Sequence, residues 1–202
     1  MSAKPVVVLA TRNAGKIAEL SSLLSGFGLT VLGLADFPQA PEVEETGATF
    51  SDNALLKARS VSRALGLVAV ADDSCLEVYA LAGRPGVFSA RYAGENATDA
   101  ANNEKLLAEL AGVPEQSRTA RFVCVMAAVR PDGGSITARG TWEGRIAAAP
   151  RGANGFGYDP VFFDPELQKT AAELDRADKN ARSHRGRALR ALIEQWPGFW
   201  RG

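Results

Sequence analysis

The first part of the chain combines a short apolar run, a polar turn and a helical pattern. Residues 6–10 are continuously apolar, which predicts a buried strand, and the polar residues 11–15 follow as a turn. The next apolar residues recur at helical spacing: Ile17, Leu20, Leu24 and Phe27. A strand that leads into a helix in this way is typical of α/β proteins, so we expect that class.

Later segments continue the alternation of strands and helices. Strand patterns occur at residues 31–34, 67–70, 76–81, 121–130, Ser135–Ile146 and 161–163, and helix patterns at residues 98–110 and 175–196. A further helix is predicted from an N-cap at Thr49, with Asp52 three residues on, to about Gly66, after an exposed loop at residues 38–47. The turn sequence at residues 131–134 predicts a hairpin, which adds an antiparallel pair. We therefore expect an elongated mixed central sheet flanked by helices.

Length and composition favour one globular domain of two lobes that spans residues 1–202. Of the 202 residues, 46% are hydrophobic, which is enough to build a core. Lys plus Arg equals Asp plus Glu at 23 each, so the chain lacks the overall positive field of proteins that bind nucleic acid or anionic membranes. No apolar run reaches membrane-spanning length, and we expect a cytoplasmic protein with neither nucleic-acid nor membrane partners.

Cysteine and histidine usage restricts the metal chemistry. Cys75 and Cys124 lie far apart in the sequence, which favours buried free thiols over a disulfide framework or a thiolate zinc site. His184 is the only histidine, so multi-histidine sites are excluded and carboxylates are the available ligands. A bound metal would then be Mg²⁺ or Mn²⁺.

The strongest single candidate for chemistry is the pair Asp72 and Asp73 at the end of the apolar run 67–70. Two adjacent carboxylates beside a buried strand are costly unless a cation or hydrogen bonds compensate them, which a metal site explains. Since side chains alternate along a strand, one carboxylate can face the site while the other caps a turn. A simple strand-end turn is an equally good interpretation of the pair alone.

The turn at residues 10–17 resembles a P-loop but lacks its first glycine and its Ser or Thr, so a true Walker A motif is not predicted. A polar turn before a helix can still present backbone N–H groups and Lys16 to an anion, although an ordinary capped turn with a solvated lysine is the simpler interpretation of this segment alone. Glu44 and Glu45 offer further carboxylates, or are simply acidic surface residues. Asn53 and Lys57 share a helix face, which suits phosphate binding or a solvated pair.

Two later segments suit a nucleotide. The sequence Gly155-Phe156-Gly157-Tyr158-Asp159 sets two aromatic side chains in a flexible backbone, which can stack on a flat base or belong to the core. The last helix carries Lys179, His184 and Arg185 among further arginines, which form either a local basic face or a solvated surface.

Taken together and in this order, these motifs resemble the inosine triphosphate pyrophosphatase family, the noncanonical purine NTP or dITP/XTP pyrophosphatases. The resemblance runs from Val6 to about Leu192 through Thr11-x-Asn13-x-x-Lys16, Glu44-Glu45-x-Gly47-x-Thr49-Phe50-x-x-Asn53-Ala54-x-x-Lys57, Ala71-Asp72-Asp73-Ser74, Pro85-Gly86-Val87-x-Ser89-Ala90-Arg91-Tyr92, Gly155-Phe156-Gly157-Tyr158-Asp159-Pro160 and Lys179-x-x-x-Ser183-His184-Arg185. Cys75 departs from the glycine that bacterial members usually carry, and we expect no effect on the chemistry.

The resemblance implies a homodimer of elongated α/β subunits, each with a substrate cleft between two lobes. It implies that Mg²⁺ is bound by Glu44 and Asp73, although Glu45 is the alternative to Glu44, and that Asp73 accepts the proton of the attacking water. The implied substrate-binding residues are Thr11, Arg12, Asn13, Ala14, Gly15, Lys16, Asn53, Lys57, Ser74, Phe156, Gly157, Tyr158, Asp159, Lys179, His184 and Arg185, with Phe156 stacked on the base.

The activity implied is hydrolysis of ITP, dITP and XTP to the monophosphate and pyrophosphate, by attack of water on the α-phosphorus. Donors from Arg185 and from His184 or Lys179 would satisfy the 6-keto oxygen of the purine, and they would disfavour the amino group of ATP. GTP shares the 6-keto group, so the preference for ITP and XTP comes from the resemblance alone.

Three other functions fit some of these patterns. A noncatalytic nucleotide-binding module would need no carboxylates placed for metal and water, unlike Asp73 and Glu44. A nucleic-acid-binding protein could use the basic last helix, but the zero net charge argues against it. A pyrophosphatase acting on other modified or ordinary NTPs is the closest competitor.

Overall fold

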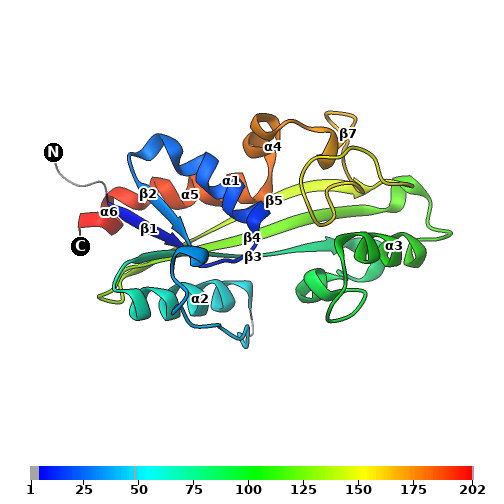
Figure 1. Ribbon diagram of the computed structural model, residues 1–202. Helices are drawn as coiled ribbons and strands as arrows, with labels where there is room; N and C mark the ends of the chain where they lie inside the picture. Colours follow the sequence, from blue (N-terminus) through cyan, green and yellow to red (C-terminus); the bar gives the residue numbers. More distant parts are fainter. Residues whose placement is uncertain (1–4, 48, 202) are drawn as a thin grey trace. The chain divides into compact units, whose positions relative to one another are not determined.

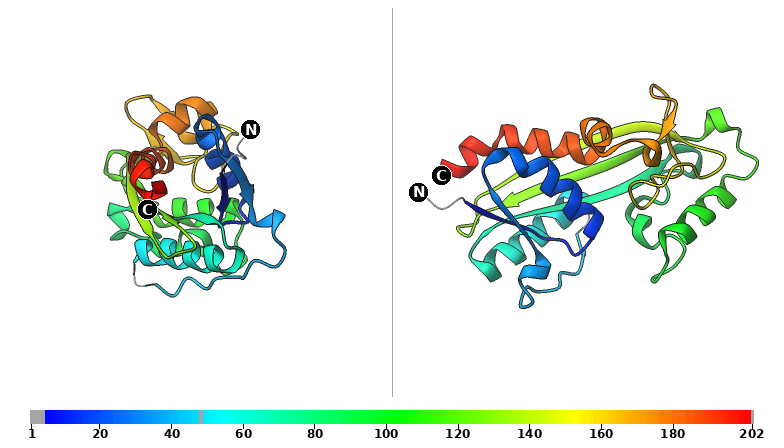
Figure 2. Two further views of the ribbon diagram at one scale, coloured as in Figure 1. Left: turned by 90° about the vertical axis from the view of Figure 1, so that its left-hand side faces the viewer. Right: turned by 45° about the horizontal axis from the view of Figure 1, so that its top comes forward.

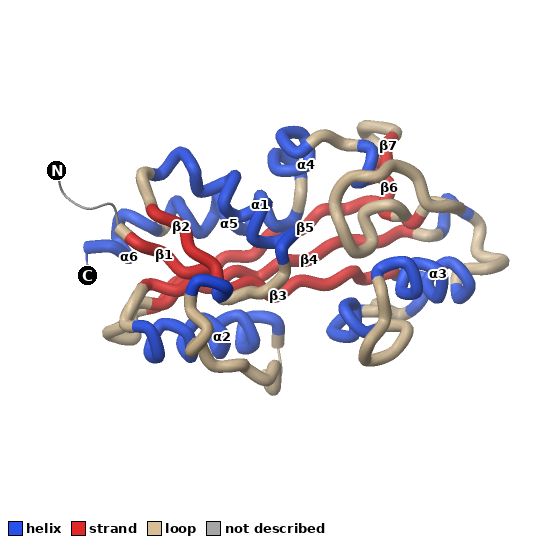
Figure 3. Tube along the Cα trace, in the orientation of Figure 1, coloured by secondary structure: helices blue, strands red, loops and turns tan. Residues whose placement is uncertain are grey.

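The computed structural model describes residues 5–47 and 49–201. Its strands form one sheet of seven in the order β2-β1-β3-β4-β5-β6-β7. The strands are β1 (Val6–Leu9), β2 (Thr30–Gly33), β3 (Val68–Val78), β4 (Thr119–Val129), β5 (Ser135–Ile146), β6 (Phe162–Asp164) and β7 (Lys169–Thr170). The helices are α1 (Ala14–Leu24), α2 (Phe50–Leu65), α3 (Asp99–Glu109), α4 (Arg176–Arg182), α5 (His184–Glu194) and α6 (Trp196–Arg201), as Figures 1 and 3 show.

The sheet is mixed, which confirms the predicted fold class. β1 pairs in parallel with β2 and with β3, whereas β6 pairs antiparallel with both β5 and β7. The predicted hairpin joins β4 to β5, and its turn is closed by the Gly133 N–H donating to the Arg130 carbonyl at 2.9 Å. Both kinds of pairing are therefore present in one sheet.

The chain divides into two compact units, and three long strands contribute residues to both. The first unit consists of Met1–Asp73, Cys124–Gly140 and Arg185–Gly202, and the second of Ser74–Val123 and Thr141–His184. Each unit has its own apolar core. The boundaries cut β3 after Asp73, and they cut β4 and β5 within their lengths.

The first unit has three layers, because its strands are apolar on both faces. Alternate strand residues such as Val7 and Leu9 pack with α1, α5 and Phe199 of α6, while Val8 packs with α2 on the other face. Figure 2 shows α1 and α5 on one side of these strands and α2 on the opposite side. Parallel strands covered on both faces are expected to be apolar throughout, as β1 is.

The second unit is built around an aromatic core. Trp142 and Phe162 are fully buried and pack with Phe122 from β4 and with Leu106 from α3. The Phe122 and Phe162 ring centroids lie 4.4 Å apart. Trp142 also donates from Nε1 to the buried Asp164 carboxylate at 2.9 Å, which satisfies the polar atom of that side chain.

Helix α2 begins and ends where the sequence predicts. Thr49 Oγ1 accepts from the Asp52 N–H, and the Asp52 carboxylate accepts from the Thr49 N–H, so both halves of the capping box are formed. Gly66 ends the helix in the left-handed conformation with φ 66°. The predicted helix at residues 98–110 is confirmed as α3, with Thr98 as its N-cap.

Three predictions about the elements were wrong. The strand at 67–70 does not end at the aspartates: β3 continues through them to Val78, because both buried carboxylates are compensated by cations. The last helix is divided, since Ser183 has extended backbone angles of φ −62° and ψ 153° that end α4. Phe27, which the helical spacing placed in the first helix, lies beyond the end of α1 in the 3₁₀ turn Ser25–Phe27 and is 50% exposed.

Both cysteines are buried and form no disulfide within the described residues, as predicted. Burial raises the pKa of Cys124 well above its usual value. Within the described residues, no helix is both long and apolar enough to cross a membrane.

Candidate functional site

Asp72 and Asp73 lie on opposite faces of β3, because side chains alternate along a strand. Val70 packs against the layer of α1 and α5, and Asp72 follows it on that face. Ala71 packs against the layer of α2, and Asp73 follows it there. The two neighbouring carboxylates therefore meet different helices, and each has its own electrostatic environment.

Asp72 is buried within a network of charges. Lys16 Nζ lies 3.0 Å from Asp72 Oδ2, and Arg185 donates to the same oxygen from both Nε and Nη2 at 3.2 Å. Arg185 also pairs with the buried Glu19 of α1 at 2.5 Å. Burial alone would raise the pKa of Asp72, but the charges of Lys16 and Arg185 hold it well below the ordinary value.

Asp73 meets the polar face of α2. Asn53 Nδ2 donates to Asp73 Oδ2 at 3.2 Å, and Lys57 Nζ lies 3.7 Å from Asp73 Oδ1. Burial raises the pKa of Asp73, opposed by Lys57 and reinforced by the negative charge of Glu45. The pKa values of the two adjacent aspartates are thus shifted in opposite directions, an arrangement suited to separate chemical roles.

Lys57 connects Asp73 to the loop before α2. Its ammonium lies 2.6 Å from Glu45 Oε1, and although burial lowers the Lys57 pKa, the charges of Asp73 and Glu45 raise it overall. The loop is held close to the helix because the Gly47 N–H donates to Asn53 Oδ1 at 2.7 Å. A Cβ at Gly47 would lie 2.6 Å from that oxygen, so only glycine allows this approach.

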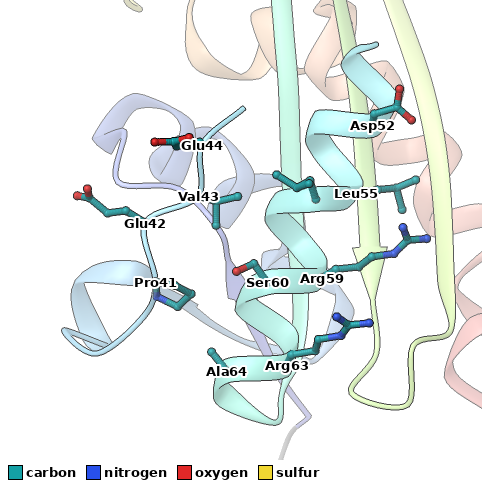
Figure 4. Close-up of a pocket in the computed structure, with 11 residues that line it drawn as sticks. Pro41, Glu42, Val43, Glu44, Asp52, Leu55, Arg59, Ser60, Arg63 and Ala64 are labelled. Carbon is teal, nitrogen blue, oxygen red and sulfur yellow. The ribbon is translucent and has the colours of Figure 1, made fainter. Parts of the chain in front are cut away.

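Glu44 has a different setting from Glu45. It lines a surface hollow of about 870 Å³ between residues 41–44 and α2. Figure 4 shows its carboxylate directed away from α2. Of the two glutamates, Glu45 is the one that shares Lys57 with Asp73.

The turn before α1 is ordered by its own side chains. Thr11 Oγ1 accepts from the Asn13 N–H, and Asn13 Oδ1 accepts from the Lys16 N–H, both at 3.1 Å. Asn13 thereby caps α1. Arg12 and Ala14 are exposed and Gly15 is half-buried, which leaves the outer side of this turn open to a ligand.

The glycine-rich segment, residues 155–159, carries further predicted site residues and lies in the second unit. Asp159 Oδ2 accepts from the Phe156 N–H at 2.8 Å and from Lys179 Nζ at 2.6 Å, and all of its side chain is buried. The Lys179 ammonium also lies 4.9 Å from the centroid of the half-buried Phe156 ring. Tyr158 is buried, and its hydroxyl donates to the Ser89 carbonyl at 2.8 Å.

The structure groups the predicted residues by unit. The first unit brings Lys16, Asn53, Lys57 and Arg185 to the two aspartates, and the second brings Phe156, Lys179 and Asp159 together. Ser74 follows Asp73 in β3 and is half-buried.

Arg185 has a position that does not favour base recognition. It is 3% exposed, and its guanidinium is directed to Asp72 and Glu19. His184, also buried, stacks on Phe122 with ring centroids 4.6 Å apart and an interplanar angle of 15°.

Sequence reasoning missed the partners that hold these groups in place. Glu19, Phe122, Asp99 and Asn103 were not among the predicted site residues, although each contacts one of them or its backbone. Asp99 and Asn103 are one helical turn apart on α3, which is the pattern of a shared face. That pattern alone does not distinguish a solvated face from one that meets a loop.

The matches to known proteins agree with this fold. The model of the Ham1 family matches residues 7–195. The chain belongs to the Ham1 family. Its resemblance to the dITP/XTP pyrophosphatases is confirmed: the dITP/XTP pyrophosphatase of Nitratidesulfovibrio vulgaris is 62% identical over 98% of this chain and 99% of its own length. That of Geobacillus kaustophilus is 55% identical over 94% and 93%.

Solved Ham1 structures show the same fold. The Ham1 protein of Coxiella burnetii superposes with a TM-score of 0.85 at 46% identity, covering 96% of this chain and 99% of that one. The nucleoside-triphosphatase, or dITP/XTP pyrophosphatase, of Mycobacterium abscessus gives a TM-score of 0.72 at 49% identity, covering 93% and 97%. The Ham1 fold therefore holds over nearly the whole chain.

The donor set around Asp73 fits a hard cation in this Ham1 protein. Asp73 and Glu45 both direct carboxylate oxygens to the Lys57 ammonium, so two carboxylates lie within reach of one cation. The described residues contain no group of three or more His, Cys, Asp and Glu side chains able to hold a metal ion. Mg²⁺ is, however, usually bound by only one or two protein carboxylates, and substrate phosphate oxygens and water supply its other ligands.

Proposed function

We propose that this chain hydrolyses the noncanonical purine nucleoside triphosphates ITP, dITP and XTP to the monophosphate and pyrophosphate. The observation that carries the proposal is the arrangement of Asp73, held by Asn53 and Lys57 in a chain that is 62% identical to a dITP/XTP pyrophosphatase. This activity removes deaminated purines from the nucleotide pool.

In the proposed reaction, Asp73 accepts the proton of the attacking water. The water oxygen forms a bond to the α-phosphorus, and the bond from that phosphorus to the oxygen bridging to the β-phosphate breaks. Pyrophosphate leaves with the bonding electrons, and no covalent enzyme intermediate is needed. Burial raises the pKa of the Asp73 carboxyl, and a general base whose pKa is closer to neutral is more effective.

The triphosphate is assigned to the first unit. Lys16 and Lys57 supply positive charge beside the two aspartates. The turn that carries Arg12, Ala14 and Gly15 lies at the start of α1, where a helix N-terminus favours an anion. Asn53 adds a side-chain amide. Charge developing on the phosphate oxygens is then met by donors that are already in place.

Mg²⁺ is the proposed cofactor, and Asp73 with Glu44 or Glu45 would hold it. The resemblance favours Glu44, whereas the shared contact with Lys57 favours Glu45. When bound, the ion supplies charge neutralisation at the phosphate oxygens and lowers the pKa of a bound water. Lys57 is the residue whose contacts would change most, because its ammonium lies against both carboxylates.

The base is assigned to the second unit, where Phe156 offers its ring for stacking. Gly157, Tyr158, Asp159, Lys179 and His184 complete the proposed recognition of base and sugar. Both predicted donors pair with buried carboxylates, Lys179 with Asp159 and Arg185 with Asp72 and Glu19, but only Lys179 also lies over the ring of Phe156, the proposed stacking residue. Lys179 is therefore the better candidate for selection against ATP.

We further propose that the enzyme acts as a cytoplasmic homodimer that binds neither nucleic acid nor membrane. The support is the resemblance for the dimer, and the balanced charge of 23 basic and 23 acidic residues for the absence of polyanionic partners. Light scattering at micromolar concentration measures the first, and salt-dependent retention on immobilised duplex tests the second.

The direct test of the proposed reaction is pyrophosphate release from ITP, dITP, XTP, GTP, ATP and CTP, with Mg²⁺ and with a chelator. Metal-dependent release confined to ITP, dITP and XTP supports the proposal. Equal release from GTP or ATP retains the reaction but removes the specificity. Binding without release from any substrate identifies a nucleotide-binding module instead.

A further inference from the structure

Helix α3 contacts the glycine-rich segment through two side chains one turn apart. Asp99 Oδ2 accepts a hydrogen bond from the Gly157 N–H at 2.6 Å. Asn103 Nδ2 donates a hydrogen bond to the Gly157 carbonyl at 2.9 Å. One helix face therefore holds both backbone polar groups of a single residue.

Gly157 is at a position where the backbone needs this support. Its φ is +63°, a left-handed conformation that glycine adopts freely but does not prefer over others. Within the same segment, Asp159 accepts from the Phe156 N–H at 2.8 Å. The carboxylates of Asp159 and Asp99 thus accept from the consecutive N–H groups of Phe156 and Gly157. The Cα of Phe156 lies between these two held N–H groups.

Asn103 makes this contact from inside the protein. It is 6% exposed, and in the described part of the chain its Oδ1 has no hydrogen-bond partner. The Asn103 side chain therefore contacts Gly157 through its amide nitrogen, Nδ2. Asp99, by contrast, is exposed and also lies in the first turn of α3, where a negative charge is favourable.

We propose that Asp99 and Asn103 are positioning residues for base recognition, which act by holding Gly157 so that Phe156 presents its ring to the purine. This inference rests on the proposed function, because it takes Phe156 as the stacking residue. Neither side chain needs to touch the nucleotide. Their removal should weaken binding of the base and leave recognition of the triphosphate unchanged.

The test compares four single variants. Asn103→Asp keeps the size of the side chain but places an oxygen against the Gly157 carbonyl, and Asp99→Ala removes the acceptor. Each should raise KM for ITP at least about fivefold, the scale of one lost bond to a buried polar group, with kcat within about twofold. Asp99→Asn retains an acceptor oxygen and should restore most of the loss. Glu104→Gln, an exposed change on α3, serves as the control.

The inhibition constant of inorganic tripolyphosphate distinguishes a loss of base recognition from a general structural defect, because only a general defect would change it. Tripolyphosphate lacks a base, so its inhibition constant should be the same in all four variants. Amide hydrogen exchange of Gly157 gives a readout without turnover: exchange should be faster in Asp99→Ala than in wild type or Asp99→Asn. Parallel weakening of ITP and tripolyphosphate, or an Asn103→Asp variant equal to wild type in KM and exchange, would overturn the proposal.

The inference and the proposed function fail in different ways. If the wild-type protein releases no pyrophosphate from ITP, the proposed reaction is wrong, and the dissociation constants of ITP and tripolyphosphate then replace KM and the inhibition constant. Selective weakening of ITP binding in Asn103→Asp and Asp99→Ala would still support the inference. If ITP does not bind to the wild-type protein at all, both proposals are wrong.

Discussion

Arg185 donates two hydrogen bonds, from Nε and Nη2, to the same oxygen of Asp72, each at 3.2 Å. The charge of Asp72 is therefore balanced inside the protein by Arg185 and Lys16. Asp73, the next residue, faces the other side of the strand and meets Asn53 and Lys57 instead. This difference gives Asp72 a structural role and is consistent with the role of proton acceptor that we propose for Asp73.

Replacing Arg185 by methionine should destabilise the protein. The change leaves Asp72 and Glu19 as buried carboxylates that have lost a shared cation, and breaking such a pair typically costs about 3–5 kcal/mol. Urea unfolding measures the loss. Arg63→Met, at an exposed position of α2, should change stability by less than about 0.5 kcal/mol. Adding Asp72→Asn to Arg185→Met should recover part of the loss, and a loss below about 1 kcal/mol in the single variant would contradict the buried network.

Replacing Asp73 by asparagine should reduce kcat for ITP by at least about 10²-fold, the scale of general-base loss. Asparagine retains an oxygen that can accept from Asn53, so nucleotide binding should persist and can be measured by calorimetry. Glu104→Gln, which neutralises an exposed carboxylate on α3, should leave kcat unchanged. An Asp73→Asn variant with full turnover would move the proton acceptor to another residue.

Gly47→Ala should impair activity without a comparable loss of stability. The new Cβ would meet Asn53 Oδ1 at 2.6 Å and Asp52 Cβ at 2.7 Å, so the loop that carries Glu45 must move away from α2. A misplacement of about 1 Å at a catalytic site can cost about 10²-fold, and we expect kcat/KM to fall at least about 10-fold. In Gly26→Ala, the matched control, the added Cβ meets nothing within 4 Å. Equal kcat/KM in both variants would show that the loop position is unimportant.

The second unit should lose stability in acid through Asp164. Burial opposes ionisation of this carboxyl, but hydrogen bonds from Trp142, from the Leu167 and Glu166 N–H groups and from Arg182 lower its pKa below the ordinary value. A lowered pKa in the folded state stabilises the protein above the unfolded pKa of about 4, and this stabilisation is lost as pH falls through the folded value.

Asp164→Asn should therefore be less stable than wild type at pH 7 and should lose less stability between pH 5 and 3. The expected difference at pH 7 is about 1.5–3 kcal/mol, the scale of a hydrogen bond to a charged group. Thermal unfolding followed by circular dichroism across this pH range measures it. Parallel pH profiles for wild type and variant would exclude Asp164 as a source of the acid dependence.

The order of the elements was predictable because it depends on neighbours in the sequence. The capping box of Thr49 and Asp52, the hairpin turn and the apolar run of β1 are local patterns, and the structure contains all of them. Local patterns also explain the errors. The acidic pair was interpreted as a strand end because its partners, Lys16 and Arg185, cannot be inferred from the segment itself.

The sequence by itself determined the fold class and the family, because periodicity, caps and ordered motifs are properties of the chain. Only the tertiary structure separated Asp72 from Asp73, paired Glu45 with Lys57, and brought α3 to Gly157. Arg185 lies 113 positions from Asp72 along the chain. Such contacts arise when packing of the apolar layers brings distant segments together. This packing, and not the residues next to a buried carboxylate in the sequence, decides which cation compensates its charge.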